Sequence, residues 1–194
     1  MELVKAVTVE KRWPSMTDDE KTGFWKAFRA VFGAVFDNLR KLSQEPNERF
    51  IGRINRGPLF DEAIDTPRDP RPGPFATVKE FHDWLSVITS HRGYRSEENP
   101  DYYRQLVPDN AAIVLTHANL HCSNILVDPE SPSTIMTIIN WDYSGWWPDY
   151  WEFCKTEYGY QPASDWNQYL IEYLEEPDEV TLDGFFNYTG AMGN

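Results

Sequence analysis

The stretch that decides the fold runs from residue 115 to 151 and reads LTHANLHCSNILVDPESPSTIMTIINWDYSGWWPDYW. Its short apolar runs, at 125–127 and 135–139, alternate with polar loops, which predicts short strands joined by a turn. Polar residues gather where these strands meet loops: His117, Asn119, His121 and Asn124 in the first loop, and Asn140, Trp141 and Asp142 after the second run. Such clusters at strand ends often form functional sites, although ordinary turn chemistry would also produce them.

The spacing of these polar residues resembles that of a known family. The pattern His117-x-Asn119-Leu120-x-x-x-Asn124, followed by Ile138-Ile139-Asn140-Trp141, resembles the core of the aminoglycoside phosphotransferase and choline kinase family. The consensus sequences of the two motifs in that family are close to HGDLHPSNILVD and IIDWE. In the related protein kinases, a loop Asp accepts the substrate hydroxyl proton, an Asn five residues later binds magnesium, and a second Asp binds magnesium at the phosphates. The resemblance maps these roles onto Asn119, Asn124 and Asn140.

Both family carboxylates are therefore amides in this chain, and the Gly of the first motif is Ala118. An amide cannot accept a proton near neutral pH and offers only an uncharged oxygen to a hard cation. Residues 1–14 resemble the segment that links the two lobes of the family. We therefore expect one α+β, mainly helical domain over 1–194 that is similar to the kinase-like C-terminal lobe, with the N-terminal lobe absent and no kinase activity.

Composition limits the classes of partner. The chain has 194 residues, of which 41% are hydrophobic and 15% aromatic, as in a folded domain with a full core. Its net charge of −13 argues against nucleic acid and anionic membrane surfaces, because both need basic patches. The two cysteines, with no recognisable signal peptide or apolar run of membrane length, predict a cytoplasmic protein.

Local signals predict several elements outside the central stretch. Capping boxes at Thr17/Glu20 and Thr77/Glu80 predict helices over 17–42 and 77–91. Further expected elements are a strand over 112–116, a helix from Asp149, a helix capped by Ser164, and a short helix over 180–188 before a frayed end. Five prolines between 57 and 74 predict a surface loop, which the family resemblance places near the acceptor site.

Candidate site residues fall into two groups. The proton-transfer and oxyanion-stabilising candidates are His121, Asp142, Asn119 and Asn140, since imidazole and carboxylate can exchange protons and amides can donate to a developing oxyanion. The expected substrate-binding residues, which include an aromatic wall, are His117, Asn124, Trp141, Tyr143, Trp146, Trp147, Tyr150 and Trp151. We expect no metal site and no cofactor. The adjacent His121 and Cys122 are a weaker candidate for a nucleophilic pair, because neighbouring side chains rarely align for this chemistry.

These observations favour a repurposed enzyme that catalyses a cofactor-free cyclisation, isomerisation or dehydration of an apolar or aromatic small molecule. Segments such as GPLFDE, EFHDWL and PDYWEFCK resemble fungal members of the family, which implies a role in fungal secondary metabolism. The alternatives are a non-catalytic pseudokinase-like binding module and an inactivated fragment of a true phosphotransferase. The face left by the missing lobe would be covered by a second copy of the chain, by another partner, or by an edge strand formed from the first residues.

Overall fold

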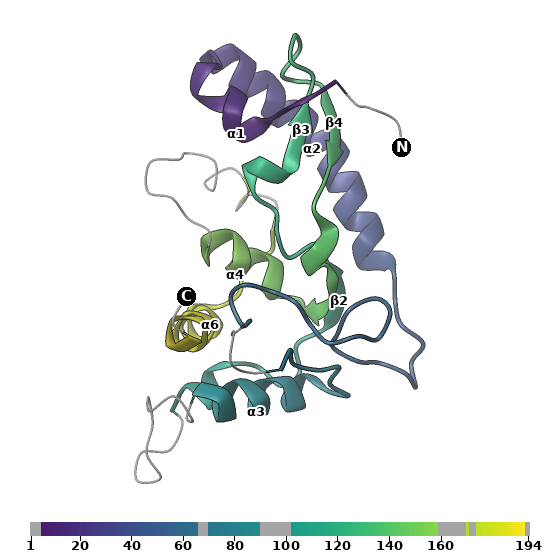
Figure 1. Cartoon of the computed structure of the whole chain (residues 1–194), viewed down its shortest axis with the longest axis vertical. Coiled ribbons are helices and arrows are strands. Elements are labelled where there is room, and N and C mark those ends of the chain that lie inside the picture. Colours follow the sequence, from purple (N-terminus) through teal and green to yellow (C-terminus); the bar gives the residue numbers. More distant parts are fainter. Residues whose placement is uncertain (1–4, 66–69, 90–101, 159–169, 171–173, 193–194) are drawn as a thin grey trace.

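The computed structural model describes residues 5–65, 70–89, 102–158, 170 and 174–192, and these form an α+β fold (Figure 1). The helices are α1 (Val9–Arg12), α2 (Asp18–Lys41), α3 (Val78–Thr89), α4 (Trp151–Tyr158) and α6 (Glu179–Met192). Single 3-10 turns are η1 (Trp13–Ser15), η3 (Tyr102–Leu106), η4 (Cys122–Asn124) and η5 (Trp141–Tyr143). The strands are β1 (Val7–Thr8), β2 (Ile113–Thr116), β3 (Ile125–Val127), β4 (Ile135–Ile138) and β5 (Gly145–Pro148).

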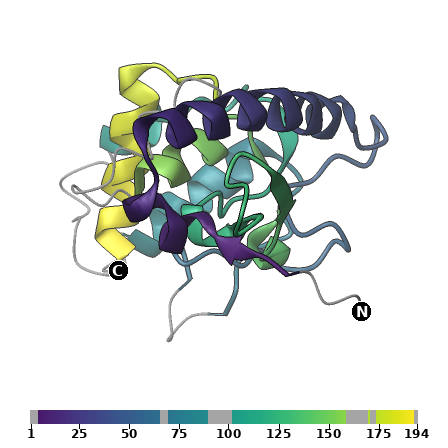
Figure 2. The same cartoon turned by 90° about the horizontal axis from the view of Figure 1, so that it is seen from above.

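The capping box at the start of α2 is present as predicted. The Thr17 hydroxyl accepts a hydrogen bond from the Glu20 amide at 3.2 Å, and the Glu20 carboxylate accepts one from the Thr17 amide at 2.8 Å. The buried residues of α2 are Phe24, Trp25, Phe28 and Phe32, whose helical spacing makes one apolar face. Figure 2 shows α2 running across one side of the small sheet that contains β3 and β4.

The strands form two separate antiparallel sheets. One has the order β1-β3-β4, and the other pairs β2 with β5. The first residues do supply an edge strand, because Val7 pairs with Val127 in β3. β5 is a strand that the sequence did not predict. It pairs with β2 and forms an isolated bridge from Trp146 to Gly52. All four of its residues are buried, so its sequence does not alternate between buried and exposed positions.

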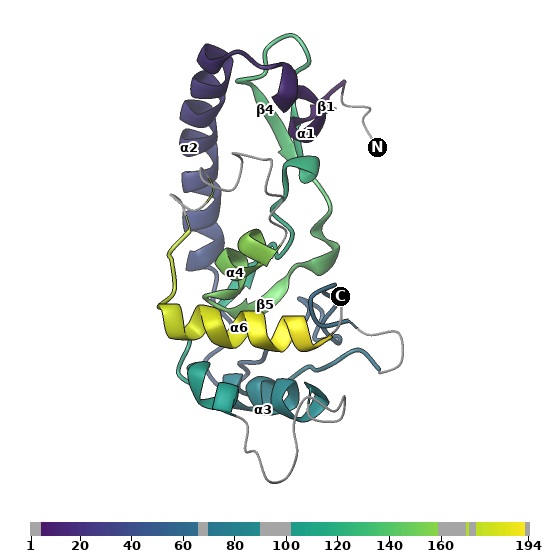
Figure 3. The ribbon, with the colours of Figure 1, turned by 90° about the vertical axis from the view of Figure 1, so that its left-hand side faces the viewer.

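Two hydrophobic clusters form the core of the described residues. One joins α2 to β1 and β3 and includes Phe28 and Ile125. The other lies where α6 packs between α3 and α4 (Figure 3). In this second cluster Trp147 stacks on Trp151 with ring centroids 4.4 Å apart, and Phe185 contacts the Trp151 ring edge-on. The aromatic residues that follow the second motif therefore belong largely to the core.

Most predicted boundaries agree with the structure to within a few residues, but the C-terminal prediction was wrong. The terminal helix continues to Met192 instead of fraying after 188, because Thr189, Ala191 and Met192 are buried and Met192 belongs to the second cluster. The helix expected after Ser164 lies outside the described residues. Among the helices that the structure describes, none has the length and apolarity needed to cross a membrane.

Candidate functional site

A buried carboxylate on α4 holds the first polar loop in place. Glu152 is 5% exposed and accepts hydrogen bonds from the amides of His117 at 2.7 Å and Ala118 at 3.1 Å. Burial raises the pKa of Glu152 to about 7, although these two amide hydrogen bonds oppose the shift. Ala118 itself has a φ of 61°, a left-handed conformation that favours glycine. The loop thus has a fixed backbone whose shape depends on a residue far along the chain.

His117 connects the two polar loops through both ring nitrogens. Its Nδ1 accepts a hydrogen bond from the Asn119 amide at 3.2 Å, so the neutral ring carries its proton on Nε2 and donates it to the Ile139 carbonyl, also at 3.2 Å. Burial lowers the pKa of His117 to about 4, which keeps the ring neutral near pH 7. Since both nitrogens are occupied and the side chain is buried, His117 positions the loops and does not line the cavity described below.

The three asparagines of the motifs meet at one point. The side-chain amide of Asn124 donates to the Asn119 carbonyl at 2.8 Å, and the Asn124 carbonyl accepts from the Ile139 amide at 2.9 Å. Asn140 follows β4 in a left-handed conformation with φ 64° and ψ 60°, and its side-chain nitrogen lies 3.4 Å from the Asn124 side-chain oxygen. The left-handed turn therefore directs Asn140 back toward Asn124.

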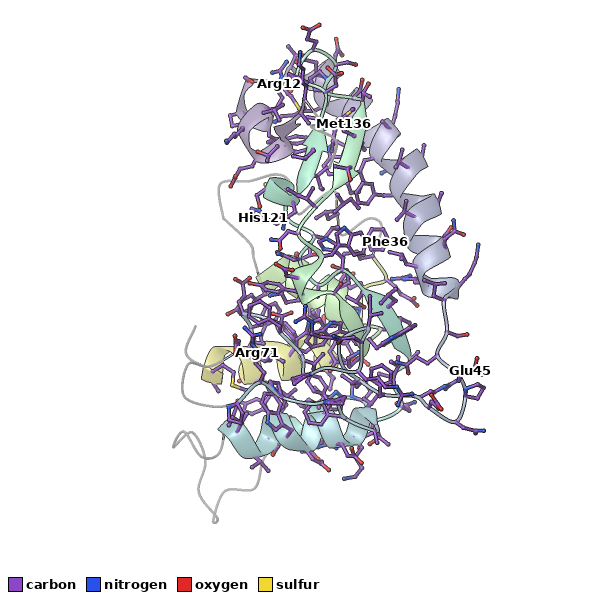
Figure 4. All side chains as sticks on the ribbon, turned by 45° about the vertical axis from the view of Figure 1, so that its right-hand side comes forward. Arg12, Phe36, Glu45, Arg71, His121 and Met136 are labelled. Atoms are coloured by element: carbon purple, nitrogen blue, oxygen red, sulfur yellow. The ribbon has the colours of Figure 1, made fainter. Side chains whose placement is uncertain are left out.

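These asparagines border a cavity of about 360 Å³. Its lining residues are mostly polar: Glu62, Asn119, Leu120, His121, Ser123, Asn124, Asn140, Tyr143, Lys155 and Thr156. They come from the β2–β3 loop, the end of β4, the η5 turn, α4 and the segment after Leu59. Figure 4 shows His121 on the turn that leads into β3.

Lys155 brings a buried positive charge to this cavity. Its side chain is 3% exposed, and its ammonium lies 2.7 Å from Asp61, which is fully buried, and 3.3 Å from Glu62, which is 57% exposed. Burial alone would lower the pKa of Lys155, but the two carboxylates reverse this effect and raise it, so the ammonium stays charged. Asp61 also accepts from the Trp151 indole at 3.0 Å, which ties the Lys155–Asp61 pair to the aromatic core.

The structure brings five of the sequence-predicted residues to the cavity: Asn119, His121, Asn124, Asn140 and Tyr143. His117 and Asp142 are not among its lining residues, and Asp142 is exposed on η5. Glu62 and Lys155 were missed. The family resemblance pointed to the proline-rich region of Glu62, but no local pattern singled out that residue, and Lys155 reads as an ordinary helical lysine.

Apart from Tyr143, the predicted aromatic residues do not line this cavity. Trp146, Trp147 and Trp151 are at most 9% exposed and are packed in the core. The Tyr150 hydroxyl donates to His82 Nε2 at 2.7 Å, since His82 Nδ1 faces the Asp109 carboxylate. Tyr150 also borders a separate cavity of about 130 Å³. Trp141 is 38% exposed and contacts His117 edge-on, with its indole donating to the Ile138 carbonyl. None of these indoles lines the asparagine cavity, whose wall is polar.

His121 and Cys122 differ in what chemistry they offer. Ser123 donates its backbone amide to His121 Nδ1 at 3.3 Å, with the Ser123 hydroxyl 2.9 Å from the same nitrogen, so the neutral ring carries its proton on Nε2. In this form His121 is a hydrogen-bond donor. Burial, together with the nearby Glu10 carboxylate, raises the pKa of the Cys122 thiol to about 11, which argues against a nucleophilic thiolate.

The magnesium site implied by the family resemblance does not fit these residues. The Asn140 amide nitrogen faces the Asn124 oxygen, so the two side chains satisfy each other instead of presenting two oxygens to a cation. The proton acceptor is missing as well, because Asn119 stands at that position. We derive no reaction step through magnesium at this place.

Comparison of this chain with models of protein families, with curated proteins and with solved structures gave no match.

Proposed function

We propose that this chain is a degenerate relative of the phosphotransferases that no longer transfers phosphate and instead acts on a small polar molecule without a cofactor. The observation that carries this proposal is the meeting of Asn119, Asn124 and Asn140 at one polar cavity. A phosphotransferase of the resembling family needs carboxylates at two of these three positions. Amides there leave the cavity able to bind a ligand but remove the proton acceptor and the charged magnesium ligand.

The hydrogen bonds of the two loops support the relationship. His117 links the first motif to the backbone just before Asn140, and Asn124 bonds back to the carbonyl of Asn119. In the resembling family the corresponding His organises the backbone near the second motif in the same way. A chain that matched the motif sequence only by chance would not be expected to form these hydrogen bonds between the two loops.

The lining of the cavity favours a polar ligand over the apolar or aromatic one expected from sequence. Asn119, Asn140 and the His121 Nε2–H group are neutral donors, and the Lys155 ammonium adds a charged one. Several donors around one point suit a carbonyl or carboxylate oxygen that gains negative charge during a reaction. A hydroxy or keto metabolite is therefore the class of ligand that we assign.

Within this proposal Glu62 replaces Asp142 as the proton acceptor. Glu62 is the carboxylate among the described residues that line the cavity, and its contact with Lys155 holds it at the rim. Removal of a proton next to a carbonyl by Glu62, with the amides and His121 stabilising the resulting enolate oxygen, is the first step of an isomerisation or dehydration. For an α-hydroxy carbonyl ligand, Glu62 returns the proton to the former carbonyl carbon while the hydroxyl proton passes to the enolate oxygen. The carbonyl group thus moves by one carbon, and atoms and charge balance without a further reactant.

One observation favours the alternative, a non-catalytic binding module. The polar groups largely satisfy one another, since Asn140 contacts Asn124 and Lys155 is paired with two carboxylates. A site with such internal pairing can bind a ligand without any group poised to move a proton.

Exchange of ligand protons in D2O distinguishes the two functions. We would screen hydroxy and keto metabolites by thermal shift, then follow each stabilising compound by NMR in D2O with the protein. The enzyme predicts exchange at the carbon next to the carbonyl, abolished by Glu62→Gln without loss of binding, while the matched Asp142→Asn variant behaves as wild type. Binding without exchange would support the binding module instead, and loss of exchange only in Asp142→Asn would overturn the assignment of Glu62.

A further inference from the structure

Three side chains with metal-binding atoms meet outside the asparagine cluster. Glu10 lies on α1, near the N-terminus, while His121 and Cys122 belong to the turn that leads into β3. The short helix α1 packs against η4, and β1 beside it pairs with β3, so residues more than a hundred positions apart become neighbours (Figure 3). One carboxylate oxygen, one imidazole nitrogen and the thiol sulfur all lie within 4.8 Å of one another.

The separations are close to those of a zinc site. With Zn–S near 2.3 Å and Zn–N near 2.0–2.1 Å, tetrahedral ligands place sulfur and nitrogen about 3.6 Å apart. The Cys122 sulfur lies 3.8 Å from His121 Nδ1 and 3.9 Å from Nε2. The Glu10 carboxylate oxygen lies within 4.8 Å of both other ligand atoms, and its side chain is exposed. The donor set also differs from an ordinary acidic patch, since it combines a thiol with an imidazole.

Ser123 is placed to orient the imidazole of such a site. Its hydroxyl is 2.9 Å from His121 Nδ1. In the structure Nδ1 accepts from the Ser123 backbone amide at 3.3 Å, so the ring proton is on Nε2. Metal binding at Nε2 moves the proton to Nδ1, where the Ser123 hydroxyl can accept it, as an outer contact of a metal-binding histidine does. The Ser123 hydroxyl is thus the acceptor available to the Nδ1 proton in the metal-bound form.

We propose that Glu10, His121 and Cys122 form a binding site for a zinc-type transition-metal ion, with an open fourth position for water. The site joins α1 to the loop that precedes β3 and shares His121 with the asparagine cavity. Three protein ligands and one open position are typical of zinc sites that are not closed structural ones. The inference rests on the geometry of these three residues. A metal at Nε2 replaces the His121 Nε2–H donor of the proposed reaction, so that donor belongs to the metal-free chain.

Zinc titration by calorimetry into the full chain, after treatment with a chelator, tests the site. We expect one zinc ion per chain, bound at least about tenfold more weakly by Glu10→Gln, by His121→Ala and by Cys122→Ser. Ser123→Ala should weaken binding by about 10–100-fold, as loss of an outer contact does elsewhere. The matched control Glu45→Gln removes an equally exposed carboxylate from another surface and should bind zinc as tightly as wild type.

Cobalt provides a second readout that does not depend on affinity. Co²⁺ bound by the wild-type chain should give a near-ultraviolet absorption band from thiolate-to-metal charge transfer. This band should disappear in Cys122→Ser and remain in Cys154→Ala, which removes the other thiol. Glu10→Gln is the decisive variant, because an exposed carboxylate-to-amide change leaves the fold intact. Equal zinc affinity of Glu10→Gln and wild type, or no zinc binding by wild type, would overturn the three-residue site.

Discussion

The buried carboxyl group of Glu152 should make the unfolding free energy depend on pH, and replacing Glu152 by Gln should remove this dependence. Its carboxyl group is buried, and its pKa rises from an ordinary value of 4.5 to about 7 in the folded chain. Between these values the folded state binds a proton that the unfolded chain has released. Stability from this group is therefore fully present below about pH 4.5 and is lost as the pH rises through about 7.

The size of this effect follows from the shift. One pKa unit corresponds to about 1.4 kcal/mol, so between about pH 5 and about pH 8 the wild-type chain should lose about 2.5 kcal/mol of unfolding free energy through Glu152. Glu152→Gln resembles the protonated acid at every pH. One side-chain oxygen can still accept from the His117 and Ala118 amides, as the Oε2 atom does at 2.7 and 3.1 Å.

Urea unfolding at the two pH values measures this difference. The stability of Glu152→Gln relative to wild type should be about 2.5 kcal/mol higher at about pH 8 than at about pH 5. Glu152→Ala leaves two buried amides without acceptors and should lose about 1–3 kcal/mol for each at both pH values. The same Gln-minus-wild-type difference at both pH values would refute the assigned role of the buried carboxyl group.

Two further predictions concern stability. Lys155→Met or Asp61→Asn alone should cost about 3–5 kcal/mol in urea unfolding, because each leaves the other charge buried, and the double variant should cost less than the sum. Additive losses would mean that the 2.7 Å pair is not coupled. Gly145→Ala should destabilise the chain by about 1–3 kcal/mol, since its Cβ would lie 2.7 Å from the Gly52 carbonyl oxygen. Gly33→Ala, which meets nothing within 4 Å, should raise stability by about 1 kcal/mol, and equal effects of the two would contradict this packing.

Much of the fold could be predicted from local sequence signals. The Thr17/Glu20 box fixed the start of α2, and the apolar runs at 125–127 and 135–139 located β3 and β4 almost to the residue. These elements carry their own caps or apolar patterns. β5 carries neither, since its pairing depends on β2 and on Gly52, and no pattern within GWWP reports partners so far away.

The site was predictable only where its residues lie in one motif. The motif spacing of the resembling family identified three residues that do meet at the cavity: Asn119, Asn124 and Asn140. Glu62 and Lys155 were not, because their pairing joins segments 93 positions apart. The proximity of Glu10 to Cys122 was not predicted for the same reason, because the two residues are far apart in the sequence. The tryptophans after the second motif were expected at a ligand, but bulky apolar side chains near a site are equally suited to the core beneath it.

Calorimetry of the full chain with ATP in the presence and absence of magnesium tests the central claim most directly. With amides at 119 and 140, we predict no magnesium-dependent binding of ATP by the wild-type chain. The Asn119→Asp/Asn140→Asp variant, which restores both carboxylates, serves as the matched comparison for any residual nucleotide affinity. Magnesium-dependent ATP binding by the wild-type chain itself would contradict the account and return this chain to the phosphotransferases.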